Sequence, residues 1–371
     1  MLEKGKINAS ELFIMVITFT IGASVLVQPA STATVAKQDA WLVSASATII
    51  SLFFAYLYNQ LAALYPSMTY IECHEKILGK WLGKGLALLF IFFLFILLFD
   101  LLREIGDFFA TEILTETPIE VIMVAFLLTS LIGVRLGLEV IFRTVVIFFP
   151  WIVTLLILLF LFIIPEIKIE NIYPILGDGL KPVMRGIYQT LTIPYVQLVV
   201  FLMVTPYVTE KAKIKKAFYW GIFIGGLILT LFVLFSIFVL GPNITARQTY
   251  PSYMLGKKIS LGNFRIEVFV AIIWILTIYF KVTVYYYGIS LGLAQILGLR
   301  DYRILLFPLA FLTFSFSIFS YSNLVELSTF ITTTAVPFLY TVTLILPLLL
   351  LVIGKIKLKR SASKVTKQPL N

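Results

Sequence analysis

The chain has 371 residues and a net charge of +10, and 60% of its residues are hydrophobic while only 13% are charged. No soluble domain of this length carries so little charge, so the composition excludes a soluble globular protein. It predicts an all-α polytopic membrane protein of one domain with about ten transmembrane helices, and orientation in the membrane explains the positive charge better than nucleic-acid binding does.

The first apolar run, residues 12–36, is long enough to cross a bilayer but is interrupted near its middle. Gly22, Ala23 and Ser24 stand there, and Pro29 follows. Gly costs about 1 kcal/mol in a helix interior and Pro about 3, and freed backbone within a membrane must be buried in protein or line a wet cavity. The run therefore predicts either a broken helix at a midplane binding site or a close helix–helix contact through small residues.

Further apolar segments bring the expected number of spans to about ten. Residues 69–85 mix apolar and charged positions at helical spacing and predict an amphipathic helix at the cytoplasmic face. The polar stretches 166–185 and 243–262 are expected outside, and the basic tail from Lys355 onward is expected to be disordered. The later spans are expected at about residues 41–64, 86–113, 117–135, 143–165, 186–207, from the basic loop 211–216 to Gly241, 265–297, 304–319 and 330–351.

The distribution of Lys and Arg predicts the orientation. With the N-terminus inside, 19 of the 29 basic residues fall on the inner side, which favours two cytoplasmic termini and an even number of spans. The start of the chain also resembles a secretory signal peptide, but Gly22 and Ser24 interrupt its apolar part, and acidic residues dilute its basic head.

The sixth expected span is interrupted at 192–195, five spans after the first interruption. Paired interruptions predict an inverted repeat, here about 9–164 and 183–354 within a domain of 1–354, followed by the tail 355–371. Exposed N–H groups at such a break favour a carboxylate, and exposed carbonyls favour an ammonium, so a zwitterionic amino acid suits the site. The alternative is two incidental kinks, since Gly and Pro are frequent in membrane helices.

Two further spans carry unusual polar residues. On the third, four charged side chains share one face and predict either the wall of an outer vestibule or a self-paired scaffold; they are Asp100, Arg103, Glu104 and Asp107. On the eighth, Lys281 has no acidic neighbour on its own helix and is a functional-site candidate. We expect its ammonium to bond the freed carbonyls of residues 21–23 or a ligand carboxylate and to replace a sodium ion; the alternative is that it snorkels to an interface. Its stripe also contains Trp274, Thr277, Tyr285 and Gly288.

Catalysis finds no support in the residue pattern. The one Cys and the one His are neighbours, Cys73 and His74, which leaves no disulfide framework, metal cluster or nucleophile–base pair. We find no Gly-rich phosphate loop and no nucleic-acid module. We therefore expect no enzyme activity, no cofactor and no bound metal.

A series of motifs in a specific order and spacing runs along nearly the whole chain: residues 22–24 with Pro29, 79–84, 103–104, 117–119, 135–139 with Arg143, 173–179, Arg265, Glu267, Trp274 and Lys281. In these motifs the chain resembles the endospore germination permease family, the B subunit of spore germinant receptors within the amino acid–polyamine–organocation superfamily. The resemblance implies ten spans in a LeuT-like 5+5 inverted repeat with broken helices 1 and 6, and residence in the spore inner membrane. It also implies assembly with an A subunit and a lipoprotein C subunit, and sensing of a small nutrient that triggers germination.

The germinant is expected to bind at the two interruptions and the eighth span. Several relatives have Gly in place of Ser24, and some have Glu in place of Gln197, so the germinant cannot be copied from a relative. The favoured function is a receptor subunit that binds a germinant; the alternatives are a transporter that works by alternating access and, less well supported, a structural anchor for the other subunits. The expected substrate-binding residues are Gly22, Ala23, Ser24, Thr192, Pro194, Tyr195, Gln197, Lys281 and Tyr285.

Overall fold

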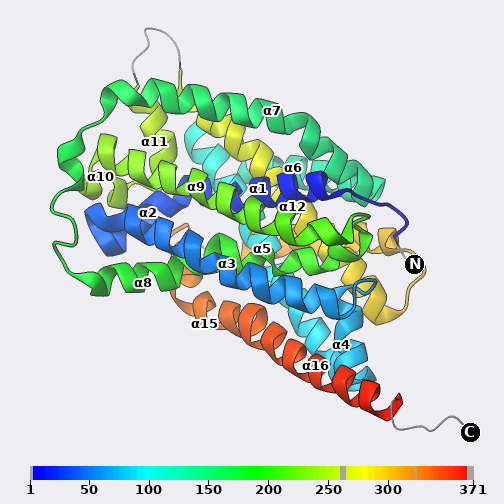
Figure 1. Cartoon of the computed structure of the whole chain (residues 1–371). Coiled ribbons are helices and arrows are strands. Elements are labelled where there is room, and N and C mark those ends of the chain that lie inside the picture. Colours follow the sequence, from blue (N-terminus) through cyan, green and yellow to red (C-terminus); the bar gives the residue numbers. More distant parts are fainter. Residues whose placement is uncertain (1–2, 260–264, 322–323, 366–371) are drawn as a thin grey trace, which may run out of the picture.

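The structure, a computed structural model, describes residues 3–259, 265–321 and 324–365. Within these ranges the chain is a bundle of helices without a strand, which confirms the predicted all-helical membrane fold (Figure 1). The longer helices are α1 (Ala9–Ile21), α2 (Ser24–Ala36), α3 (Ala40–Leu64), α4 (Tyr70–Leu78), α5 (Lys80–Phe108), α6 (Ile119–Leu136), α7 (Leu138–Ile163), α8 (Leu180–Thr190), α9 (Ile214–Leu240), α11 (Pro251–Lys258), α12 (Glu267–Leu297), α13 (Leu306–Phe319) and α16 (Leu346–Val365).

Nine segments of the described chain are long and apolar enough to cross a membrane. They match the second to tenth predicted spans, and in the first of them α2 continues into α3. The predicted first span is instead two helices, α1 and α2, of 13 residues each. Neither half reaches the about 20 residues that a membrane crossing requires. The division of the chain into two inverted repeats stays a prediction.

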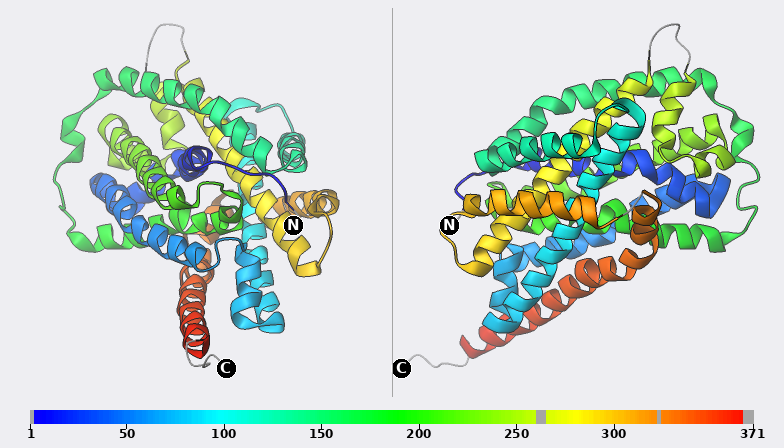
Figure 2. Two further views of the ribbon diagram at one scale, coloured as in Figure 1. Left: turned by 45° about the vertical axis from the view of Figure 1, so that its right-hand side comes forward. Right: turned by 180° about the vertical axis from the view of Figure 1, so that it is seen from behind.

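Burial separates central segments from peripheral ones. We compare the share of residues that are buried within the apolar 18-residue stretch of each segment. It is 83% in the segment Leu180–Met203 and 67% in α12, but only 22% in the segment that begins with α7. Figures 1 and 2 accordingly show α7 along one side of the bundle, while α12 crosses its middle and packs on α5, α6, α7 and α1. A membrane helix with so many apolar side chains exposed faces lipid, so α12 belongs to the interior and α7 to the perimeter.

Three predicted boundaries differ from the structure. The helix expected over 69–85 ends at Leu78, because Gly79 adopts a positive φ of 90° and α5 starts at Lys80. The stretch 243–262, expected as a polar external segment, contains α10 (Pro242–Arg247) and α11, with 260–262 outside the described residues. The tail expected to be disordered from Lys355 is helical up to Val365, and 366–371 lie outside the described residues.

The segment before α1 fastens two loops at one end of the bundle. The N–H of Ile7 donates to the carbonyl of Tyr207 (3.1 Å), and the N–H of Thr209 donates to the carbonyl of Ile7 (2.9 Å). The buried carboxylate of Glu3 accepts a hydrogen bond from the hydroxyl of Tyr302 (3.2 Å), which precedes α13. The loop before α9 and the loop before α13 are therefore both attached to the N-terminal segment, which we call the N-terminal strap (residues 3–9).

Candidate functional site

The first interruption is fixed by Gly22, whose φ is +22°. L-residues with a side chain avoid positive φ, whereas Gly adopts it freely. A Cβ at this position would lie 2.7 Å from Cδ of Lys281 and 2.9 Å from the carbonyl oxygen of Phe19. The absence of a side chain thus allows both the break between α1 and α2 and the close approach of the Lys281 stem. The interpretation of this break as a midplane binding site stays a prediction.

The second half of the first span is attached to α11 through a freed carbonyl. In a regular helix the carbonyl of Val25 would accept from the N–H of residue 29, but Pro29 has no N–H. The hydroxyl of Ser252 in α11 donates to this carbonyl instead, at 2.5 Å. The sequence shows the missing donor at Pro29, but no local pattern indicates that Ser252 replaces it.

The second interruption follows α8, where the turns η5 (Leu191–Tyr195) and η6 (Val196–Met203) are not α-helical. Ile193 has φ −137° and ψ 114°, which is extended backbone. The carbonyl of Val196 accepts from the hydroxyl of Tyr58 in α3 (2.9 Å). Backbone freed from helical bonding within the bundle is therefore satisfied by a side chain of a neighbouring helix, as burial in a membrane protein requires.

The end of α1, η6 and α12 meet around Phe19. Its ring lies 5.3 Å from that of Tyr285 and 5.1 Å from that of Phe201. The ammonium of Lys281 lies over the same ring at 5.0 Å from its centroid, a geometry in which the ring face attracts a cation. The hydroxyl of Tyr285 donates to Oε1 of Gln197 at 2.8 Å. Phe19 was not among the predicted site residues, because an apolar residue within an apolar run carries no distinguishing signal.

All nine predicted site residues are buried, but they do not all converge. Gly22, Lys281, Tyr285 and Gln197 are joined through the contacts around Phe19. The hydroxyl of Thr192 bonds within its own segment, to the carbonyl of Gln189 (2.6 Å), and that of Tyr195 bonds Oγ1 of Thr48 in α3 (2.7 Å). For Ala23, Ser24 and Pro194 the structure shows burial next to the interruptions.

Of the two partners expected for Lys281, the carbonyls of residues 21–23 are not bonded to it, and a ligand carboxylate stays a prediction. Its side chain is 0% exposed, so it does not snorkel to an interface, and among the described residues its ammonium has no hydrogen-bond partner, so it does not bond the carbonyls of residues 21–23. The acid in its neighbourhood is Glu104 of α5, a helix that packs on α12. Spacing within one helix does not indicate an acid on another helix.

Several buried polar atoms near this region lack a hydrogen-bond partner within the described part of the chain. Such atoms are uncommon in folded proteins, because an unmet donor or acceptor costs roughly 1–3 kcal/mol. The ring of Phe108 in α5 links two of their side chains, at 4.5 Å from the ring of Trp274 and 5.0 Å from that of Tyr250. The atoms are Ser24 Oγ, Glu104 Oε1, Tyr250 OH, Trp274 Nε1 and Lys281 Nζ.

The other charges of the third span form a scaffold. The guanidinium of Arg103 pairs with Asp107 (Nε–Oδ2 3.1 Å) and also donates to carbonyls at the end of α13, including that of Ser317 (3.3 Å). The carboxylate of Asp100 accepts from the hydroxyl of Tyr321 at 2.8 Å. The interpretation as a self-paired scaffold therefore describes only Arg103 and Asp107, since Asp100 bonds a tyrosine outside the span and Glu104 Oε1 has no hydrogen-bond partner in the described ranges.

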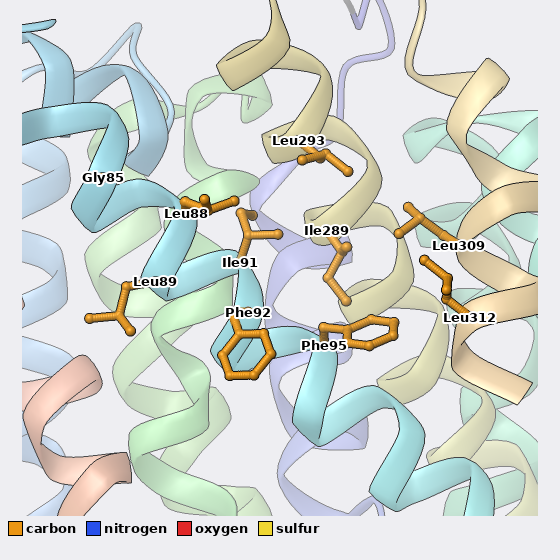
Figure 3. A pocket seen from close by; sticks show the side chains of 10 residues that line it. All are labelled: Gly85, Leu88, Leu89, Ile91, Phe92, Phe95, Ile289, Leu293, Leu309 and Leu312. Atoms are coloured by element: carbon orange, nitrogen blue, oxygen red, sulfur yellow. The ribbon is translucent and has the colours of Figure 1, made fainter. Parts of the chain in front are cut away.

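The predicted site is closed in this conformation. An apolar groove of about 520 Å³ lies elsewhere, between α5, α12 and α13 (Figure 3), and a polar pocket of about 250 Å³ lies between α4 and the end of α12. None of the nine predicted residues lines either of them. A ligand would therefore reach the interruptions only after the helices around them move apart.

The pair Cys73 and His74 lies on α4 and is buried against α5. Burial lowers the pKa of His74 to about 4 and raises the pKa of the Cys73 thiol to about 12, so both are neutral at pH 7. Nδ1 of His74 bonds the carbonyl of Tyr70 at 2.7 Å. In the described ranges no group of three or more His, Cys, Asp or Glu residues is placed to hold a metal ion.

Comparison with known sequences matches residues 6–325 to a family model described as spore germination protein. The chain is similar to three proteins of Bacillus subtilis (strain 168). It is 28% identical to spore germination protein KB over 313 residues (83% of each chain) and 27% identical to spore germination protein YndE over 301 residues (78% of this chain, 81% of the other). It is 30% identical to spore germination protein A2 over 310 residues (79% and 81%).

Among solved structures, the fold is similar to that of a manganese transporter mutant from Eremococcus coleocola. The TM-score is 0.53, and the match covers 100% of this chain and 92% of the other. The two sequences are 12% identical, so the likeness is one of fold alone.

Proposed function

The chain belongs to the spore germination protein family, and from this membership we propose that it is the germinant-sensing membrane subunit of a spore germinant receptor. In this function it binds a small nutrient at the interruptions of the first and sixth spans and so triggers germination. The observation that carries the proposal is the buried side chain of Lys281: its stem lies against Gly22, and its ammonium has no hydrogen-bond partner in the described ranges. An ionisable side chain buried within a membrane protein marks a functional site by default.

An amino acid is the nutrient class that suits these residues. The start of α2 presents Ser24 and the positive end of a helix without a side-chain cap, which favour a carboxylate. Gln197 and Tyr285 are bonded to each other, and Tyr285 packs beside Phe19, so both offer polar atoms to the same region. Ala23, Thr192, Pro194 and Tyr195 complete the predicted set beside the two interruptions.

The proposal includes an A subunit and a lipoprotein C subunit as partners, the spore inner membrane as location, and both termini on the core side. The family membership supports the partners and the membrane, and the excess of Lys and Arg in the loops assigned to the inner side supports the orientation. The two inverted repeats, about 9–164 and 183–354, belong to the same proposal and are favoured by the fold shared with a transporter.

Deletion of the gene in the spore-forming organism that carries it tests the receptor function. We expect deleted spores to lose the response to one nutrient and to keep the response to non-nutrient triggers, and a plasmid copy should restore it. The measurement is the fall in optical density of a spore suspension against nutrient concentration, for each of the twenty amino acids and for glucose. Deleted spores whose responses all equal those of the parent would refute the proposal.

The fold shared with a manganese transporter favours a second candidate, a transporter that works by alternating access. A receptor subunit needs only a ligand-dependent shift between conformations, whereas a transporter must release the solute on the other side. Steady uptake of a labelled amino acid by the purified protein in liposomes would establish transport. Binding of the amino acid without uptake would leave sensing as the function of this subunit.

The proposed orientation makes a labelling prediction. In a Cys73→Ser background, a cysteine introduced at Lys215, in the basic loop before α9, should react with an impermeant thiol reagent only from the core side. A cysteine at Lys181, at the start of α8, should react only from outside. Both lysines are exposed, so accessibility through protein does not limit either reaction. Labelling of position 215 from outside would invert the orientation.

A further inference from the structure

The ammonium of Lys281 is held in a fixed place beside the first interruption. The side chain is 0% exposed, its Cδ occupies the space that a Cβ at Gly22 would need, and its Nζ lies over the ring of Phe19. The stem is therefore confined on two sides, and Nζ cannot reach water without a movement of α1 or α12. Its charge must be balanced within the bundle, because an isolated charge at this depth is costly.

Glu104 of α5 stands on the helix that faces Lys281. It lies one turn before Phe108, whose ring packs on Trp274, and Trp274 lies two turns before Lys281 on the same face of α12. Helices α5 and α12 pack on each other, which brings Glu104 and Lys281 into the same region, although no hydrogen bond joins Glu104 Oε1 to Lys281 Nζ. Neither of these two atoms has a hydrogen-bond partner in the described chain.

The neighbouring charges are engaged elsewhere. Arg103 and Asp107 form an ion pair, and Asp100 accepts from Tyr321. Glu104 and Lys281 are therefore the two opposite charges of this region whose hydrogen-bonding capacity is still unused at the atoms named above. Lys281 is buried, so removing Glu104 would be costly if the two charges compensate each other, because the buried charge would be left alone.

We propose that Glu104 and Lys281 are the specificity-determining charges of the ligand site and that they exchange partners when a ligand binds. They neutralise each other in the closed protein; on binding, the ammonium of a zwitterionic ligand turns to Glu104 and its carboxylate turns to Lys281. This inference rests on the proposed function and adds Glu104 to the site. It restricts the ligand to molecules that carry both an amine and a carboxylate and are neutral overall.

The surrounding polar atoms suit a ligand whose carboxylate faces Lys281 and whose ammonium faces Glu104. Ser24 Oγ, a hydroxyl that can donate, lies at the start of α2, where the positive end of the helix dipole also favours a carboxylate. The ring of Tyr250 packs on Phe108, one turn after Glu104, and its hydroxyl can accept from an ammonium. A ligand that lacks the amine would bring an uncompensated negative charge, and one that lacks the carboxylate an uncompensated positive charge.

Thermal unfolding of four purified proteins tests the mutual compensation: wild type, Glu104→Gln, Lys281→Met and the double variant. We expect each single change to lower the midpoint by several degrees and the double change to recover most of that loss, because it leaves no lone charge. Glu112→Gln, Lys257→Met and their double variant are the matched control. That pair, 2.7 Å apart, is partly exposed on the surface and should show little coupling. Losses that simply add in the Glu104/Lys281 double variant would refute the compensation.

Binding of each of the twenty amino acids to the wild-type protein, followed by calorimetry of the best one, tests the partner exchange. We expect both single variants and the double variant to bind it at least about 30-fold more weakly, as the loss of a buried charged contact predicts. The amide of that amino acid and its analogue without the amine should bind the wild type as weakly. Wild-type affinity in the double variant, or no binding of any amino acid to the wild type, would overturn the inference. Neither result would decide whether the protein is a receptor subunit. That question is answered separately by the deletion experiment, which measures the nutrient dependence of germination in spores.

Discussion

Spores that carry Gly22→Leu should not germinate at any concentration of the nutrient that triggers the parent strain. Any side chain here meets two obstacles, the positive φ of the residue and the stem of Lys281, which a Cβ would approach to 2.7 Å. The Leu side chain would also occupy the region where the interruption, α12 and the proposed ligand meet. Even Gly22→Ala should weaken the response strongly, because the clash begins at Cβ.

The measurement is the optical-density response of spores, together with an immunoblot that shows a normal amount of protein in the membrane. Gly85→Leu is the matched control. It places the same side chain in the same membrane, at a helical glycine where an added Cβ meets no atom within 4 Å. We expect its half-maximal nutrient concentration to equal that of the parent. A Gly22→Leu strain with a normal dose–response curve would remove the interruption from the site.

The response of the wild-type protein should be independent of sodium, and Lys281→Met should abolish it. Sodium-coupled transporters hold the ion at discontinuous helices, between unwound carbonyls, and Lys281 places an ammonium beside such an interruption. A sodium ion there would lie next to a like charge in a poorly screened interior, where repulsion is strong. Met preserves the length of the stem and removes the charge. The side chain therefore still packs against Gly22 and Phe19, but the positive charge that is proposed to bind the ligand carboxylate is absent.

Spores of each strain, germinated in sodium buffer and in potassium buffer of equal ionic strength, provide the measurement. Lys257→Met serves as the control for the loss of a positive charge, since that lysine lies at the surface and pairs with Glu112. Lys281→Arg is not expected to rescue, because the planar guanidinium needs a different geometry. A sodium requirement in the wild type would contradict the role of Lys281, as would a normal response of Lys281→Met.

Local sequence signals predicted most of the fold. The spans emerged from apolar length, and the expected second span, 41–64, is almost coextensive with α3 (Ala40–Leu64). Gly22 marked the first interruption, because a residue without a side chain at mid-membrane weakens a helix whatever surrounds it. The end of α4 at Gly79 was missed, since the amphipathic pattern continues past it into α5.

Contacts between distant segments could not be predicted in the same way. Lys281 was singled out by its depth, but the acid in its neighbourhood, Glu104, lies on another helix, and single-helix spacing says nothing about which faces meet. The helix α11 was read as part of a polar loop, although Ser252 inserts a hydroxyl toward α2. Arg103 was grouped with its acidic neighbours, yet much of its bonding goes to carbonyls of α13. Such pairings depend on the packing of the whole bundle.

Hydrogen exchange at the N-terminal strap can report how often the end of the bundle that it holds opens. Its two backbone bonds, from Ile7 to Tyr207 and from Thr209 to Ile7, break together when the strap leaves the loop before α9. The amide protons of Ile7 and Thr209 then become open to deuterium, whereas amides within the long helices stay protected. The exchange rate of these two amide protons therefore measures how often the strap detaches from the loop before α9, and it can be compared with and without a nutrient.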